Sequence, residues 1–375
     1  MHDPISAPAR APRRFLKPLI ALIVVFAAVL IGGRWNLNEY AITPGQATPV
    51  APLVKVQGVK TDPHNDKIML VDVYLSTLNV FQWIGLHFES HVQYVPADEL
   101  IEPGVPSGEL GPQGYQEMND SKQAAEVAAF RALGWKVPAT QTGTAITGIV
   151  APSPAYSANL QVGDEIVGVD RHTVTSNCGL VAIVHSLAPG TRLRLSVKKA
   201  KISQSGVFTL ERATTVVLAT AKAPSYVGAT GCAGVTGPNR SWLGVTIEDA
   251  TNYMLPAAVS INTADIGGPS AGLAMTLALI DKLSHGSLTG HHVIAVTGTI
   301  AVNGSVGDVG GVAEKTVAAS RAGATIFFVP QVEVATAKSV GEPGLRIVGV
   351  TSLKQVLSDL RLLGGAAPIP LTKPH

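Results

Sequence analysis

The feature that most constrains this chain is an uncharged, apolar run near its start, residues 18–33 (PLIALIVVFAAVLIGG). In a helix, these 16 residues span about 24 Å at about 1.5 Å each, and flanking Lys17 and Arg34 can extend the span by snorkelling. The hydrocarbon core of a bilayer is about 30 Å thick. We therefore predict a transmembrane helix over residues 18–35, which divides the chain into a short tail and a large body.

Two other interpretations of this run compete with an anchor. A buried core helix would carry a polar face, and residues 19–31 have none. A cleaved signal peptide has the same basic start and apolar stretch, but no Ala-x-Ala site follows, so we favour an uncleaved anchor. Four basic residues precede the run, and the positive-inside rule then makes residues 1–17 a cytoplasmic tail. The expected location is the cell membrane, single-pass, with the body extracytoplasmic.

The charge balance excludes a nucleic-acid partner. The whole chain of 375 residues carries a net charge of +2, but residues 1–34 hold five basic residues and one acid. The body therefore has 23 basic and 25 acidic residues, a net of −2, and no basic stripe. Its length predicts two to three folded units.

Residues 41–136 read as an α+β segment. Met69, Val71, Val73 and Leu75 alternate with their neighbours as in a strand, and a helix is predicted where MNDSKQAAEVAAFRALG ends at Gly134. A loop rich in proline and glycine, residues 96–114, separates the two.

Residues 137–222 form a distinct unit that resembles bacterial PDZ domains. The resemblance is carried by Ser153-Pro154-Ala155, Val162-Gly163-Asp164-Glu165-Ile166 and Val169-Asp170. It implies a small β-barrel or sandwich with helices, whose strand edge binds an extended peptide. The carboxylate-binding loop is then expected at Thr142, Gly143 and Thr144. A PDZ unit that only packs against its neighbour is the alternative.

The two cysteines, Cys178 and Cys232, lie 54 positions apart. An extracytoplasmic compartment permits a disulfide between them. Two separate buried small residues fit the sequence equally well, because spacing alone does not supply the distance between them.

A candidate nucleophile is Ser270, in the stretch DIGGPSAG that leads from a predicted strand into an apolar helix. Backbone N–H groups at a helix start have no intrahelical partner, and with the helix dipole they can stabilise an oxyanion. Serine is also an ordinary helix cap, so this stretch alone leaves a structural role open.

Lys315 follows Ser270 by 45 positions, in TGTIAVNGSVGDVGGVAEK. The two stretches together resemble the proteolytic domain of Lon proteases, in which GPSAG carries the nucleophilic serine and the TG…GG(L/V)xEK pattern the general-base lysine. The resemblance implies a Ser270–Lys315 dyad with Thr297 orienting the lysine. The N–H groups of Gly268 and Ser270 are the oxyanion-hole candidates.

A lysine serves as base only when burial and the lack of an acidic partner lower its pKa toward neutrality. Glycine, alanine and valine surround Lys315 in sequence, and charged residues make only 14% of the chain, against about a quarter in soluble proteins. We therefore expect surroundings poor in carboxylates.

One departure from the Lon pattern is Gly267, where the family has an acidic residue, while Asp265 lies two positions earlier. This pattern, and the order anchor, PDZ, Lon-like domain, resemble membrane-anchored proteins of the YlbL kind. Residues 118–125 are similar to the MKESAQAA helix that precedes the Lon serine. The fold expected is therefore α+β: residues 41–136 and 223–365 form one mixed α/β domain with the PDZ inserted, and residues 366–375 form a tail. A separate N-terminal domain is the alternative.

Other chemistries fit less well. Glu314 stands where a P-loop needs glycine before its lysine, so no ATPase, and no cofactor, is expected. His291 and His292 adjoin a predicted strand and would point to opposite faces, which argues against a metal site. A triad of Ser270 with His285, His291 or His292 lacks any surrounding motif.

The sequence thus predicts a membrane-anchored, ATP-independent serine endopeptidase that cleaves exported or membrane proteins, with a PDZ domain that binds substrate or partner. The expected partners are peptide or protein substrates and the lipid bilayer, and the Lon resemblance alone implies a hexameric ring. A catalytically silent envelope scaffold or chaperone is the alternative, and a protease blocked by its PDZ domain until a ligand docks is a third.

Overall fold

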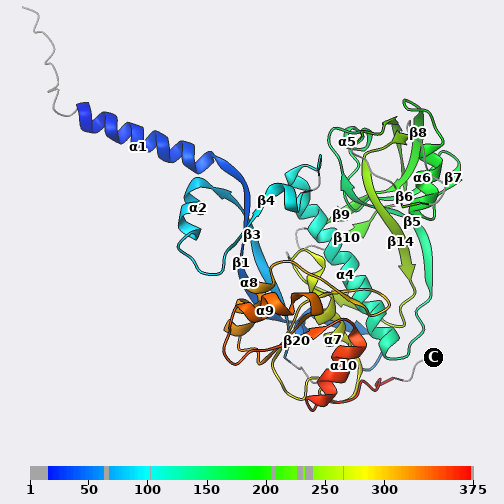
Figure 1. Ribbon diagram of the computed structural model, residues 1–375. Helices are drawn as coiled ribbons and strands as arrows, with labels where there is room; N and C mark the ends of the chain where they lie inside the picture. Colours follow the sequence, from blue (N-terminus) through cyan, green and yellow to red (C-terminus); the bar gives the residue numbers. More distant parts are fainter. Residues whose placement is uncertain are drawn as a thin grey trace, which may run out of the picture.

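A computed structural model describes residues 16–62, 67–101, 103–203, 208–225, 231–232, 240–264 and 266–372. Figure 1 shows a helix that projects from the rest of the chain, a layered α/β part, and a second part rich in strands. Most of the expected cytoplasmic tail, residues 1–15, lies outside the described residues.

The projecting helix is α1 (Leu16–Arg34), which covers the apolar run. None of the helices in the described ranges meets the length and apolarity needed to cross a membrane. The transmembrane helix predicted over residues 18–35 is therefore unconfirmed.

The α/β part is built on one six-stranded sheet that joins distant segments of the chain. Its strand order is β20-β19-β16-β3-β1-β4. The strands are β1 (Asn36–Pro49), β3 (Ile68–Asn79), β4 (Gln93–Pro96), β16 (Ile294–Val296), β19 (Ile326–Pro330) and β20 (Arg346–Val350). β3 pairs antiparallel with β1 and parallel with β16, with Ile68 opposite Ile294. Strands from before and after the second part therefore share one sheet.

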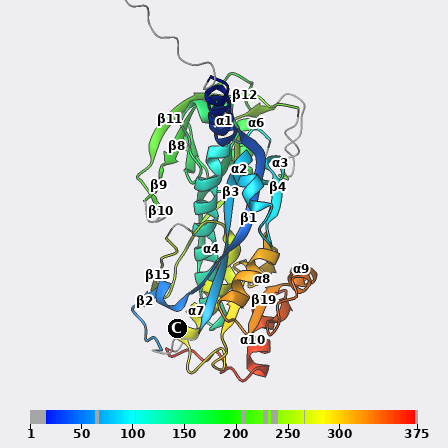
Figure 2. The same ribbon diagram turned by 90° about the vertical axis from the view of Figure 1, so that its left-hand side faces the viewer.

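Helices cover both faces of this sheet. Successive strand residues point to opposite faces, so neighbouring residues of one strand pack against different helices. Leu70 and Phe328 pack with α4 (Leu110–Ala132), α7 (Gly272–Leu283) and α10 (Leu353–Leu362). Met69 and Phe327 pack on the other face with α8 (Val312–Arg321) and α9 (Val334–Ser339). Figure 2 shows α4 running between the two parts of the chain.

Helix α4 is longer than predicted. It begins at Leu110, inside the stretch predicted as a loop, and its first turns hold Pro112 and Gly114. Proline is tolerated in the first turn of a helix, because the N–H it lacks has no intrahelical partner there.

The second part has its own core and its own sheet, in the order β11-β8-β6-β5-β14. The strands are β5 (Ala139–Ile149), β6 (Glu165–Val169), β8 (Arg192–Lys198), β11 (Thr214–Ala219) and β14 (Val245–Tyr253), with β7 (His172–Thr173) paired to β6. Helices α5 (Pro154–Ser157) and α6 (Asn177–His185) complete the unit.

Strand β14 corrects the predicted boundary of this unit at residue 222. It pairs with β5 from Val245 opposite Ile149 to Tyr253 opposite Ala139. Its sequence, VTIEDATNY, is too polar to read as a strand of this sheet without the pairing. The disulfide Cys178–Cys232, with a Cα–Cα distance of 5.5 Å, ties the segment before β14 to α6.

The remaining elements are short. They are η1 (Ala51–Leu53), β2 (Val54–Gln57), α2 (Val80–Leu86), α3 (Ala97–Leu100), η2 (Ser107–Glu109), β9 (Ala200–Ile202), β10 (Phe208–Leu210), β12 (Ala221–Lys222), β13 (Ser241–Trp242), β15 (Ala258–Ile261), η3 (Pro269–Ala271), β17 (Thr299–Ile300), β18 (Val306–Gly307) and η4 (Gln331–Glu333).

Candidate active site

Ser270 lies where the chain passes from strand β15 into the buried helix α7. The loop enters η3 through Gly268, whose φ of 83° is in the left-handed region that favours glycine. Helix α4 holds the loop by two contacts: the Gly268 N–H donates to the Gly114 carbonyl at 2.7 Å, and Ser121 Oγ donates to the Pro269 carbonyl at 2.9 Å. The serine is thus fixed at a helix start.

The main chain of Ser270 is also held from the side of β17. The Gly298 N–H donates to the Ser270 carbonyl at 2.9 Å, and Thr297 Oγ1 donates to the same oxygen at 3.4 Å. Thr297 is fully buried. The hydrogen bond that the structure gives the Thr297 hydroxyl is thus to the backbone of the serine, whereas the sequence led us to expect one to Lys315.

Lys315 reaches the same cavity from helix α8. It lies in the first turn of α8, which follows the cap residue Gly311 with its φ of 65° and packs on β1 and β3. A Cβ at Gly311 would lie 3.1 Å from Val73 Cγ1, so glycine also permits this close approach. Ser270 and Lys315 both line one cavity of about 530 Å³. The two residues of the predicted dyad are therefore brought together.

The electrostatics of this cavity favour a neutral lysine. Lys315 is only 2% exposed, and this burial lowers its pKa to about 8. The negative charges of Asp72, Glu333 and Glu314 act in the opposite direction and raise the pKa. An amine with a pKa near 8 is neutral in a substantial fraction of molecules at mildly alkaline pH, as a general base requires.

The surroundings of Lys315 are less poor in carboxylates than we expected. Asp72 lines the same cavity, and its Oδ1 accepts the Gln46 N–H at 2.7 Å. Burial raises the pKa of Glu314, next to Lys315 in the chain. Asp72 lies on β3, far from the serine and lysine motifs in sequence, and no pattern around it marks it as part of the site.

A second cavity residue that sequence reasoning missed is Thr263. Its side chain is 2% exposed, and its hydroxyl has no hydrogen-bond partner among the described groups. A buried hydroxyl without a partner destabilises a fold by about 1–3 kcal/mol. Nothing in the flanking sequence signals this residue.

The two oxyanion-hole candidates differ in the structure. The N–H of Gly268 is already bonded to Gly114, so in this conformation it is not free to bind an oxyanion. The Ser270 N–H lies in the first turn of η3, where backbone donors have no intrahelical partner. A Cβ at Gly267 would lie 3.3 Å from the backbone of Gly114, so glycine permits a close approach of the loop to α4. Asp265 lies outside the described residues.

The described histidines lie away from this cavity. No histidine is among its described lining residues, and His292 Nε2 lies 3.2 Å from the Leu363 carbonyl instead. The described part of the chain holds no group of three His, Cys, Asp or Glu side chains that could bind a metal.

The carboxylate-binding loop predicted at Thr142, Gly143 and Thr144 is wrong. These residues lie within β5, where Thr144 faces Ile166 of β6 on one side and Asp249 of β14 on the other. Thr144 is thus paired on both sides and Gly143 is paired with Ala250 of β14, so these residues belong to a strand of the sheet and do not form a separate loop. The prediction failed because β14, which covers this edge, arrives from beyond the predicted domain boundary.

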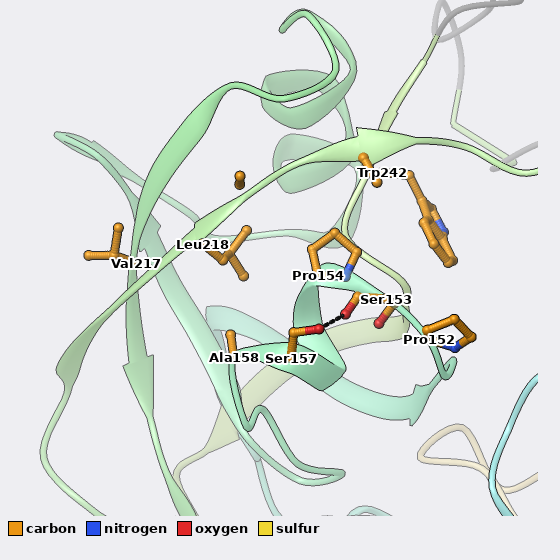
Figure 3. A pocket seen from close by; sticks show the side chains of 10 residues that line it. Pro152, Ser153, Pro154, Ser157, Ala158, Val217, Leu218 and Trp242 are labelled. Atoms are coloured by element: carbon orange, nitrogen blue, oxygen red, sulfur yellow. Dashed lines mark hydrogen bonds between the residues drawn. The ribbon is translucent and has the colours of Figure 1, made fainter.

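The second part has a groove elsewhere, beside its edge strand β11 (Figure 3). Its volume is about 490 Å³, and its lining is largely apolar. The labelled residues are Pro152, Ser153, Pro154, Ser157, Ala158, Val217, Leu218 and Trp242. Among the residues that the structure describes, β11 pairs in this sheet with β8 alone, so the groove lies beside a strand edge.

Comparisons with known proteins agree with this architecture. Residues 260–362 match the Lon protease (S16) C-terminal proteolytic domain, and residues 131–205 match the PDZ domain. The chain is 34% identical over 135 residues to Lon protease 1 of Herpetosiphon aurantiacus, covering 35% of this chain and 16% of that protein. It is 48% identical over 64 residues to Lon protease of Clostridioides difficile, covering 17% and 8%.

The first-mentioned relative is thus matched over about a sixth of its length. The crystal structure of the PDZ domain of the SdrC-like protein from Listeria monocytogenes aligns over 29% of this chain and 90% of its own, at 15% identity and a TM-score of 0.22, too slight a likeness to carry an argument. The chain carries a Lon-type proteolytic domain and a PDZ domain in a mixed α/β fold.

Proposed function

We propose that this chain is a membrane-tethered, ATP-independent serine endopeptidase of the YlbL kind, in which Ser270 and Lys315 form the catalytic dyad. The observation that carries the proposal is the shared cavity, in which a buried lysine with a pKa of about 8 lies with a serine at a helix start. The Lon-type match over residues 260–362 includes both residues and supports a serine peptidase.

The reaction is an acyl transfer. The Ser270 hydroxyl attacks the carbonyl carbon of the scissile peptide bond while its proton passes to the neutral Lys315 amine. The resulting ammonium then gives that proton to the leaving amine, and water hydrolyses the acyl-enzyme with the lysine again as base. The hydrogen bonds to the carbonyl oxygens of Ser270 and Pro269 hold the nucleophile in place through both steps.

Substrate and location follow from the rest of the chain. Glu314 stands where a P-loop would need glycine, so the proposed peptidase acts without ATP on extended segments. The groove beside β11 offers such a segment a strand edge with an apolar lining. The apolar run of α1 supports a tether in the cell membrane with the body outside the cytoplasm, which makes exported and membrane proteins the proposed substrates. A homo-oligomeric ring would follow the Lon relatives.

Covalent labelling of Ser270 tests the proposal. A peptide boronate or fluorophosphonate should modify Ser270 in the absence of ATP, as read by mass spectrometry, and Ser270→Ala should remove the adduct. Lys315→Met should slow labelling by about 10²–10⁴-fold, the usual contribution of a general base. Matched controls are Ser157→Ala in the PDZ groove and Lys354→Met on the exposed side of α10. Equal labelling of the parent and Lys315→Met would exclude the dyad.

One observation favours a gated form of the same peptidase. Glu248, on β14 of the PDZ sheet, faces Asp120 on α4. The pKa of Asp120 is raised to about 8, mainly by burial and next by the negative charge of Glu248. The next residue, Ser121, donates a hydrogen bond to the Pro269 carbonyl. The Gly114 carbonyl of α4 accepts the Gly268 N–H. A movement of the PDZ domain would therefore act on α4 and through it on the oxyanion hole. A PDZ ligand that accelerates Ser270 labelling would support this form, whereas no change with any bound ligand would exclude it.

A further inference from the structure

Helix α2 leaves Phe81, Trp83 and Ile84 exposed at the surface. None of its seven residues is buried, although six of them are apolar or glycine. Trp35, Phe81, Trp83, Ile84 and Phe88, which we call the aromatic patch, are all exposed, and Phe88 is 86% exposed. Residues 80–88 contain no acidic, lysine or arginine side chain. Contiguous exposed apolar groups of this kind mark an interaction surface.

The helix itself is well defined without any support from the core. Asn79 caps it by accepting the N–H groups of Phe81 and Gln82, and the Gln82 side chain accepts the Asn79 N–H in return. Trp83 and His87 stack with their ring centroids 5.0 Å apart. The patch is therefore a fixed structure that presents its rings outward.

The aromatic patch lies directly against the end of α1. Asn36, two residues after α1, pairs with Asn79, the cap of α2. A Cβ on Gly32 of α1 would lie only 2.9 Å from Phe81 Cε2, so the ring packs on the bare backbone of the helix. Both views show α2 beside this end of α1 (Figures 1 and 2).

We infer that the aromatic patch is a lipid-binding surface that lies in the headgroup region of the bilayer, beside the point where α1 emerges. The inference rests on the proposed membrane tether. Its basis is that the aromatic patch continues the exposed apolar surface of α1. A single apolar medium, the bilayer, would cover both surfaces. The exposed apolar side chains of α1 include Leu19, Ile20, Leu22, Ile23, Phe26 and Val29.

The composition of the patch favours a bilayer over a second protein copy. Tryptophan rings are enriched at the boundary between headgroups and acyl chains, because they are apolar with one polar N–H. The patch has two of the four tryptophans of the chain. Arg34, the last residue of α1, can reach the phosphate layer from the same place. A bilayer bound in this way would fix the tilt of the body relative to α1.

A fluorescent label at position 88 tests the inference. Both native cysteines are in the disulfide, so Phe88→Cys provides a single thiol for an NBD label on the full chain, handled without reductant. The chain is reconstituted in phosphatidylcholine vesicles. We expect the label to shift its emission to the blue and to be quenched by lipids that carry a nitroxide near the headgroup. Leu362→Cys on α10, where the native side chain is 83% exposed, is the matched control and should emit as in water.

A third label, Leu22→Cys on α1, separates this inference from the tether it rests on. Quenching at position 22 with a water-like label at position 88 would overturn the inference and keep the tether. A label at position 88 that is shielded from lipid and cross-links to position 88 of a second copy would also overturn it, in favour of an interface between copies. Lack of quenching at both positions would overturn the tether and the inference together, while Ser270 labelling in detergent still reports on the peptidase.

Discussion

Replacing Lys315 with methionine should make the folded chain more stable at neutral pH. Burial lowers the pKa of Lys315 to about 8 from 10.5, which means that the folded state disfavours its ammonium form. Between these two values the unfolded chain binds a proton that the folded chain does not, so this lysine makes stability rise with pH across that window. Below about pH 8 its destabilising effect is fully present, and above about pH 10.5 it is absent.

The size of the effect follows from the shift. At about 1.4 kcal/mol per pKa unit, the shift corresponds to about 3 kcal/mol of lost stability at pH 7. Methionine is similar in length and carries no charge, so it fills the same space without this cost. The free energy of unfolding of Lys315→Met at pH 7 should therefore exceed that of the parent by up to about 3 kcal/mol, and the difference should shrink toward zero near pH 10.

Urea denaturation at pH 7, 8, 9 and 10 measures this difference. Both chains carry Ser270→Ala, so that self-cleavage does not interfere, and subtracting one from the other cancels the groups they share. Lys354→Met, at an exposed lysine of α10, is the control and should show no such trend. A Lys315→Met chain that is less stable than the parent at pH 7, or a difference that does not vary with pH, would mean that the lysine is charged and well paired. The general-base argument would then fail.

Three further predictions concern other parts of the chain. Asp72→Asn removes a charge that raises the pKa of Lys315, so the alkaline rise in the rate of Ser270 labelling should move to lower pH; an unchanged profile would exclude an influence of Asp72 on the lysine. Gly268→Ala places a side chain at a φ of 83° and should lower the free energy of unfolding by about 1–2 kcal/mol, measured by urea denaturation, with Gly310→Ala, where a Cβ meets open space, as control. Reduction of Cys178–Cys232 opens a loop with a sequence separation of 54 and should destabilise the PDZ unit by about 4 kcal/mol, seen as faster hydrogen exchange in β5 and β8 but not in β16.

That Ser270 and Lys315 lie at one site could be predicted from the sequence, because each residue lies in a compact motif. Ser270 and Lys315 are each flanked by glycines and by a helix start, and the cavity contains both. Asp72 and Thr263 share that cavity without a local pattern, since only the pairing of β3 with β16 and the path of the loop after β15 bring them there. Contacts between distant segments do not produce a recognisable sequence pattern around the residues that make them.

The PDZ unit shows a second reason why prediction from the sequence was incomplete. The residues of its signature lie on or next to α5 and β6, but the strand that completes the sheet, β14, alternates apolar and polar residues only over Val245–Glu248 and is largely polar after that. A half-exposed edge strand needs little apolar character, so its role is decided by backbone pairing with β5. The misplaced carboxylate-binding loop at Thr142–Thr144 is a direct result.

The sheet that joins both ends of the chain has a consequence for the order of folding. One side of β3 pairs with β1 and the other with β16. Ile294 of β16 lies opposite Ile68 of β3 and 226 positions after it in the chain. During synthesis β1 and β3 are made early, and the whole PDZ unit can form before the strand that lies against β3 exists. Lys315 is made later still, so it can be buried against β1 and β3 only after most of the chain has been synthesised. In the peptidase that we propose, a newly made chain would therefore lack a neutral lysine base, and could not cut itself or its neighbours, until this part of the fold has formed.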